Sequence, residues 1–269
     1  MPAATRPYTH RVDLGQILAV LGAGFGAGFV LTAVGAGSLV SFPILLGVGL
    51  SPLVANICNN VGLVPGGLSG TYGYRRELTG HRHLVVQVAL TSATGALLGA
   101  TLLLTMPSSI FDRVVPFLVL VAASLVGAQP FVSRWLLWRG VRRGAEPVPD
   151  RLRMGPRLTG MSSLVGVYGG YFGAAQGVLL VAFLALGLDI SLQAVNGLKN
   201  VAILSANLAA SVVFILFAPL DWAVVGLVAL GSVVGGWLGA HLGRRLPPVA
   251  FRSLVVVFGY AVAIRLLLG

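Results

Sequence analysis

The sequence predicts an all-α polytopic membrane protein with 8–10 transmembrane segments, built from two five-segment repeats of opposite orientation, each with a short interrupted helix. Three observations predict it. Of the 269 residues, 57% are hydrophobic and only 9% are charged, whereas a soluble domain needs about 25% charged residues to cover a water-facing surface. The apolar residues form long runs, several near the ~20 residues of a spanning helix. One pattern also recurs along the chain at a constant offset.

Ten apolar segments are separated by polar breaks that contain turn residues such as Ser51-Pro52 and Pro247-Pro248. The predicted segments are roughly 14–34, 38–50, 53–72, 84–106, 114–138, 158–174, 178–188, 192–217, 222–243 and 249–268. Residues 1–13 are predicted to be a polar N-terminal tail, 14–138 the first repeat, 139–157 a basic cytoplasmic linker and 158–269 the second repeat. The first segment is interpreted as structure and not as a cleaved signal peptide, because a similar segment returns in mid-chain at 158–174.

The two halves align without gaps at an offset of 140 residues, which gives eight identities in the window 35–61. Leucine and glycine matches are common in such a composition, but paired asparagines within apolar segments are not. Asn56 aligns with Asn196, and Asn60 aligns with Asn200. The sequence therefore predicts an internal duplication.

The arginines predict how the halves are oriented. Five segments per half make the second half enter the membrane from the opposite side. With the N-terminus outside, the inside loops carry most arginines, as the positive-inside rule requires. The inside set is Arg75, Arg76, Arg82, Arg139, Arg142, Arg143, Arg151, Arg153, Arg157, Arg244, Arg245 and Arg252, and the outside set is Arg6, Arg11, Arg113 and Arg265.

An alternative is that segments 38–50 and 178–188 only dip into the membrane and return, so that each half has four crossings. Loop 244–252 then lies outside with its three arginines, which fits the charge pattern less well. The net charge of +11 needs no nucleic-acid partner, because the basic residues occupy short loops and form no single patch.

The two short segments point to a cavity. Thirteen helical residues reach only about 20 Å, against the ~30 Å hydrocarbon core. Glycines that can interrupt a helix precede both, with Gly35 and Gly37 in one half and Gly173 and Gly177 in the other. Paired, interrupted segments in two halves mark the binding site of many transporters. The glycines of the first segment, Gly22, Gly24, Gly26 and Gly28, are spaced for close helix packing.

One charge stands within an apolar segment. Lys199 lies about two turns into 192–217, and an ionisable group there indicates a functional site unless its side chain extends to the membrane surface. The neighbouring asparagines either line a polar cavity or only join helices by hydrogen bonds. The predicted substrate-binding residues are Gly35, Gly37, Ser38, Asn56, Asn59, Asn60, Gln176, Gly177, Asn196, Lys199 and Asn200.

The chemistry of this set favours a small anion. Helix N-termini at Gly37-Ser38 and Gln176-Gly177 are expected to present unpaired N–H groups and positive dipole ends. All seven acidic residues and all four histidines lie in loops or at segment ends, and Cys58 is the only cysteine. No catalytic residues, metal ligands or cofactor are therefore predicted, and the chain is not expected to be an enzyme.

The sequence resembles the sulfite exporter TauE/SafE family of membrane transporters. The resemblance rests on a glycine-rich first helix, then GAGSLVSFPILLGVGLSPLVAN at 35–56, a basic loop and two further spans, with the pattern repeated as GAAQGVLLVAFLALGLDISLQAVN at 173–196. It implies export of sulfite or a related organosulfonate or organic acid.

We therefore expect a secondary transporter in the cell membrane that moves a small anion by alternating access. Its expected partners are the lipid bilayer, the anionic substrate, a coupling ion (proton or sodium) and a second copy of the chain in a homo-oligomer. Two alternatives remain open: a passive anion channel, and a membrane sensor or assembly subunit without transport activity.

Overall fold

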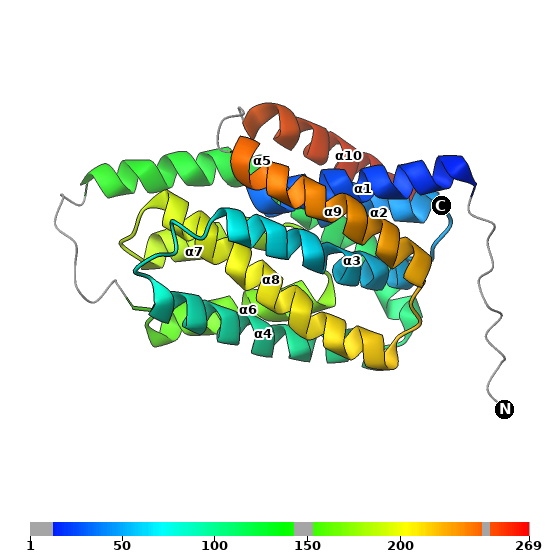
Figure 1. Ribbon diagram of the computed structural model, residues 1–269, viewed down its shortest axis with the longest axis horizontal. Coiled ribbons are helices and arrows are strands. Elements are labelled where there is room, and N and C mark those ends of the chain that lie inside the picture. The colour runs from blue at the N-terminus through cyan, green and yellow to red at the C-terminus, as the bar shows by residue number, and fades with distance from the viewer. Residues whose placement is uncertain (1–12, 143–152, 244–247, 269) are drawn as a thin grey trace.

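A computed structural model describes residues 13–142, 153–243 and 248–268 (Figure 1). Within these segments every regular element is an α-helix. The helices are α1 (Leu14–Ala33), α2 (Ser38–Gly47), α3 (Pro52–Gly73), α4 (Arg82–Thr105), α5 (Ser108–Arg142), α6 (Pro156–Tyr171), α7 (Gln176–Gly187), α8 (Leu192–Phe217), α9 (Trp222–Leu242) and α10 (Pro248–Leu268). The prediction of an all-α polytopic membrane protein is confirmed.

Each of the ten predicted segments corresponds to one helix, and the largest difference in bounds concerns α5. This helix begins at Ser108 and not near residue 114, because Asp112 and Arg113 lie in its first turns, where charged side chains can still reach water. It also continues to Arg142, into the predicted linker 139–157. Residues 143–152 of that linker, and residues 1–12 of the predicted tail, lie outside the described residues.

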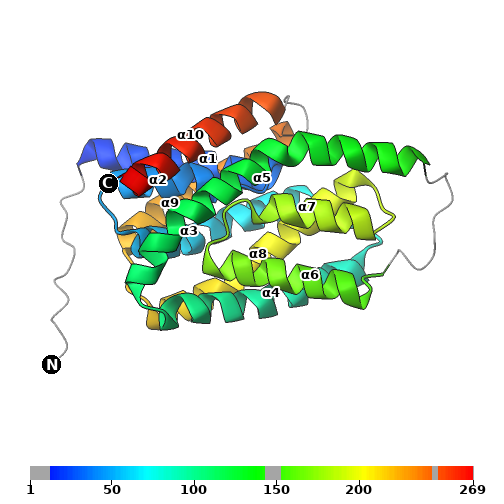
Figure 2. The same ribbon diagram turned by 180° about the vertical axis from the view of Figure 1, so that it is seen from behind.

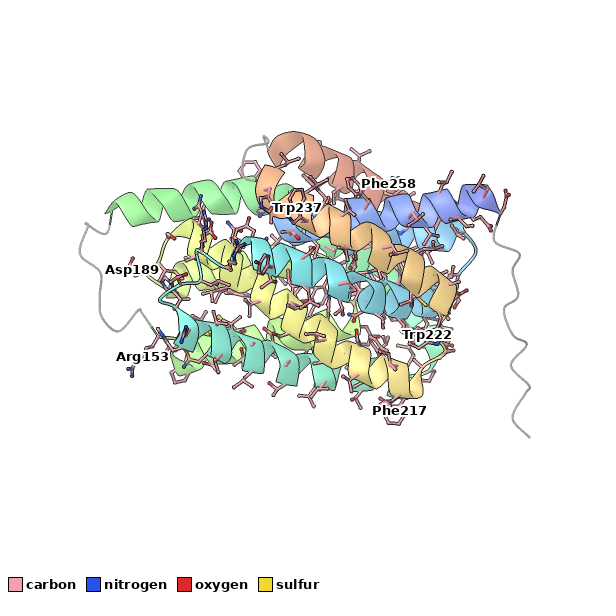
Figure 3. The ribbon with its side chains drawn as sticks, in the orientation of Figure 1. Arg153, Asp189, Phe217, Trp222, Trp237 and Phe258 are labelled. Carbon is pink, nitrogen blue, oxygen red and sulfur yellow. The ribbon has the colours of Figure 1, made fainter. Side chains whose placement is uncertain are left out.

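Five of the described helices are long and apolar enough to cross a membrane: α1, α4, the Ser108–Gln129 part of α5, α8 and α9. Large apolar side chains cover the outside of the molecule, and Phe217 and Trp222 are 76% and 60% exposed. Figure 3 shows these two at one end of the molecule, with Arg153 and Asp189 at the other. An exposed apolar surface of this kind marks contact with a membrane or another protein, and the helices long enough to span indicate lipid.

Successive helices run in alternating directions along the long axis of the molecule (Figures 1 and 2). The loop after α3, the loop before α8 and the start of α6 therefore share one end, which we call the arginine-rich end because Arg75, Arg76 and Arg157 belong to it. The loop between α8 and α9 lies at the opposite end. This alternation agrees with the ten-segment topology expected from the arginines.

Two broken helical hairpins form the centre of the molecule. Helices α1 and α2 make one, and α6 and α7 make the other, with tips at residues 34–37 and 172–175. Helices α2 and α7, of 10 and 12 residues, lie in opposite halves of the long axis (Figures 1 and 2). Their lengths are about 15 and 18 Å, each roughly half of a hydrocarbon core. Neither helix alone reaches across the molecule.

Helix contacts in one half have counterparts in the other under the 140-residue offset. The pair α1–α9 corresponds to α4–α6, α3–α9 to α4–α8, α1–α2 to α6–α7, and α2–α3 to α7–α8. Glycines allow the closest of these approaches. A Cβ on Gly24 or Gly28 would overlap the backbone of α9, and one on Gly166 or Gly170 would overlap that of α4. The predicted packing role is confirmed for Gly24 and Gly28, whereas a Cβ on Gly22 would touch nothing.

Candidate functional site

The two hairpin tips meet at Gly35 and Gly177. The amide N–H of Gly177 donates to the carbonyl oxygen of Gly35 at 3.0 Å. A Cβ on Gly35 would lie 2.6 Å from the Cα of Gly177, and Gly35 has a φ of +87°, which disfavours any side chain. Gly37 is equally constrained, since a Cβ there would overlap the backbone of Ala27 in α1. The three predicted glycines thus lie at or beside a direct backbone contact between the halves.

The start of α7 differs from the prediction of unpaired N–H groups. The Gln176 N–H donates to the Gly173 carbonyl at 3.3 Å, and the Gly177 N–H is used by Gly35. The chain can turn back this tightly because Gly173 and Ala175 both have a positive φ, of 75° and 59°. The prediction is therefore wrong for these two amides.

Lys199 lies fully buried beside the tips. Its ammonium donates to the carbonyl oxygen of Thr32 at 2.8 Å, and its Cδ would lie 3.2 Å from a Cβ on Gly35. The side chain does not extend to the surface, so that interpretation is wrong. Thr32 belongs to the last turn of α1, where a positive charge interacts favourably with the helix dipole. No acidic side chain of the described segments pairs with Lys199.

Gln176 is a second buried polar group at the tips. Its side chain is 1% exposed, and neither its Oε1 nor its Nε2 has a hydrogen-bond partner in the described part of the chain. The amide lies against Gly169 of α6, where a Cβ would come within 2.6 Å of Nε2. A buried amide without partners is costly, and it is available to bind a ligand.

The aligned pair Asn56 and Asn196 have different roles. Asn56 Nδ2 donates to the carbonyl oxygen of Tyr171, the last residue of α6, at 3.0 Å. Asn196 is half-buried and donates to Leu192 of its own helix. Asn56 and Lys199 therefore act alike, since each binds the C-terminal end of the broken helix in the other half. Asn196 is not part of this arrangement.

The remaining asparagines join helices. Asn59 donates to Ser38 Oγ at 3.0 Å and accepts a hydrogen bond from Ser41, which ties α3 to α2. Asn60 donates to Asn207 Oδ1 at 3.4 Å and accepts from Ser211 at 3.3 Å, both on α8.

Asn200 is buried, and its Nδ2 has no partner in the described segments. The structure thus brings Asn56, Asn59 and Lys199 to the hairpins, whereas Asn60 lies in the α3–α8 contact.

Sequence reasoning missed several partners: Thr32, Ser41, Asn207 and Ser211. Ser41 follows Ser38 by one turn, a spacing that could have revealed it. The described residues contain no group of three His, Cys, Asp or Glu side chains that could hold a metal ion. What the site offers is one buried cation and neutral amides and hydroxyls, which can bind and orient an anion.

Helices broken near the middle of the molecule, with polar side chains at the breaks, are typical of membrane transporters. Residues 20–266 match the model of the family described as Sulfite exporter TauE/SafE, and the chain belongs to this family. It is accordingly a membrane transporter.

Relatives cover nearly the whole chain. The chain is 30% identical to a probable membrane transporter protein, ORF9, of Sinorhizobium sp, over 91% of this chain and 90% of the relative. It is 26% identical to a probable membrane transporter protein of Haemophilus influenzae, over 95% of this chain and 96% of the relative. It is 27% identical to the probable membrane transporter protein YfcA of Escherichia coli K12, over 90% of this chain and 86% of the relative. No solved structure matches the chain.

Proposed function

We propose that the protein is a secondary transporter that exports a small anion, such as sulfite, an organosulfonate or an organic acid, across the cell membrane. The observation that carries this proposal is Lys199, which is fully buried at the hairpin tips without an acidic partner in the described segments. The family description names sulfite as one substrate of this chemical class.

The argument for an anion is electrostatic. A buried ammonium group is strongly unfavourable unless it is paired and hydrogen-bonded. Within the described residues Lys199 has one hydrogen bond, to Thr32, so an ammonium with three donors retains capacity for a ligand. The unpartnered amide of Gln176 adds a donor that an oxyanion can use. A bound anion would lower the cost of burying both groups.

The mechanism we propose is alternating access by inverted repeats. The correspondence of helix contacts under the 140-residue offset supports two equivalent halves, and the opposite placement of α2 and α7 supports opposite orientation. The narrow contact between the tips is where one half can rock against the other. A proton or sodium gradient would drive the cycle, and no catalytic step is needed.

The decisive experiment is transport of sulfite into proteoliposomes that contain the purified protein. A carrier is stimulated by anion on the far side of the membrane, so counterflow is expected to raise the initial rate. Lys199→Gln keeps a hydrogen-bond donor but removes the charge, whereas Lys199→Met removes both. We expect Lys199→Gln to lower the rate at least about tenfold and to unfold closer to the wild-type temperature than Lys199→Met.

Asn196→Ala is the matched control on the same helix, because among the described residues the Asn196 side chain donates only to the Leu192 carbonyl of its own helix. It should transport at close to the wild-type rate. A Lys199→Gln protein as active as the wild type would contradict the proposed site. Flux without counterflow stimulation would indicate a channel, and no flux of sulfite, sulfoacetate or simple carboxylates would indicate a sensor or assembly subunit.

A further inference from the structure

Helices α3 and α8 pack against each other as an antiparallel pair whose facing positions are well defined. Gly67 faces Leu204, whose side chain lies 3.4 Å from a Cβ built on that glycine. Toward the arginine-rich end, Gly197 faces Tyr74, with a Cβ distance of 3.6 Å. Toward the opposite end, Asn60 faces Asn207 and Ser211.

Away from the arginine-rich end, the polar groups of this contact satisfy each other. Asn60 both donates to Asn207 and accepts the hydroxyl of Ser211, and all three side chains are buried. This end of the contact is closed by direct hydrogen bonds between the two helices.

Toward the arginine-rich end, two of the corresponding polar atoms lack a hydrogen-bond partner in the described part of the chain. Thr71 lies one turn after Gly67 and Asn200 one turn before Leu204, so the two occupy facing positions. Asn200 is 5% exposed, and neither its Nδ2 nor the buried Oγ1 of Thr71 has a hydrogen-bond partner in the described segments. Under the 140-residue offset they are the counterparts of Asn60 and Ser211.

We propose that Thr71 and Asn200 form a second binding position for the transported anion, on the α3–α8 contact between the hairpin tips and the arginine-rich end. This inference rests on the proposed function. Both side chains can donate to an oxyanion, and a buried donor without a partner is costly until a ligand supplies one. Lys199 precedes Asn200 directly, and Arg75, Arg76 and Glu77 follow Thr71 within two turns, so the nearby charges sum to a net positive charge.

The surroundings fit a position that is reached from this end. Tyr74, which is buried, and Leu78 lie over Gly197 at the beginning of α8. Both belong to the short stretch that connects α3 to α4 at the arginine-rich end. A small movement of that stretch would open the position to the side predicted to be the cytoplasm, while the Asn60 cluster keeps the opposite end closed.

The test compares near-isosteric variants of counterpart residues. Thr71→Val and Asn200→Leu remove the proposed ligands, and Ser211→Ala is the matched control. Sulfite is the probe, and its KM is measured separately from each side in oriented vesicles. We expect each of the two variants to raise the KM for sulfite on the arginine-rich side by about tenfold, which corresponds to the binding free energy of one or two neutral hydrogen bonds. The KM measured from the opposite side should not change.

Thermal unfolding without sulfite gives an independent readout. Ser211→Ala breaks a hydrogen bond and should lower the unfolding temperature, whereas Thr71→Val removes an unpartnered buried hydroxyl and should not. A wild-type KM on the arginine-rich side in both variants overturns the proposal, as does a fall in unfolding temperature for Thr71→Val equal to that for Ser211→Ala. The proposed function would fail differently, by an absence of sulfite, sulfoacetate and carboxylate transport in the wild type or by full activity of Lys199→Gln.

Discussion

Replacing Gly35 by alanine should damage the contact between the hairpin tips more than any conservative change within α1 or α2. The new Cβ would lie 2.6 Å from the Cα and 3.0 Å from the carbonyl carbon of Gly177, and these are backbone atoms that no rotamer change can move. The φ of +87° adds about 1–2 kcal/mol of strain for a residue with a side chain. Overpacking adds about 1–3 kcal/mol, so the free energy of unfolding is expected to fall by about 2–5 kcal/mol.

The assay is thermal unfolding of the detergent-purified protein, followed by the fluorescence of its four tryptophans. At about 2–4 °C per kcal/mol for a chain of this size, Gly35→Ala should unfold roughly 4–20 °C below the wild type. Gly47→Ala is the control at the far end of α2, where a Cβ meets nothing within 4 Å. The assigned contact would be refuted if both variants unfolded within about 2 °C of the wild type.

Three further changes test neighbouring features by the same measurement. Ala175→Gly should raise the unfolding temperature by about 1–4 °C, because it relieves the left-handed backbone at φ 59°; a fall would show that this conformation is not strained. Asn56→Ala should lower the free energy of unfolding by about 1–3 kcal/mol, because it leaves the last carbonyl of α6 unpaired. Asn196→Ala should lower it by less than about 0.5 kcal/mol, and equal effects would contradict the difference in their roles. Gly24→Ala should lower the free energy of unfolding by about 1–3 kcal/mol, because its Cβ would overlap the backbone of α9. Gly22→Ala should leave it unchanged or raise it slightly, and a larger loss for Gly22→Ala than for Gly24→Ala would refute the α1–α9 packing.

Most of the fold could be predicted from the chain, because composition and segment length are local properties. Ten segments, two of them too short, correspond to ten helices in the described residues. What segment lengths could not predict is that each short helix pairs with its predecessor in a hairpin, and that the two tips meet. That arrangement depends on a contact between Gly35 and Gly177, residues from different halves of the chain.

The site was predictable in its charge but not in its partners. Lys199 stands out in any apolar segment, yet its acceptor is a backbone carbonyl 167 positions away, and a carbonyl carries no signal in the sequence. The aligned Asn56 and Asn196 look equivalent, although only the former faces another helix end. Thr71 and Ser211 were missed because isolated hydroxyl residues in helices usually bond their own backbone.

The hydrogen bonds at the hairpin tips also bear on how the protein is made. The carbonyls of Thr32 and Gly35 find their donors in Lys199 and Gly177, so the first hairpin cannot satisfy its own backbone when it is synthesised. Ribosomes add about 5–20 residues per second, and the 167 positions between Thr32 and Lys199 therefore represent about ten to thirty seconds of synthesis. During that interval the tip of the first hairpin must be sheltered by water, lipid headgroups or the insertion machinery.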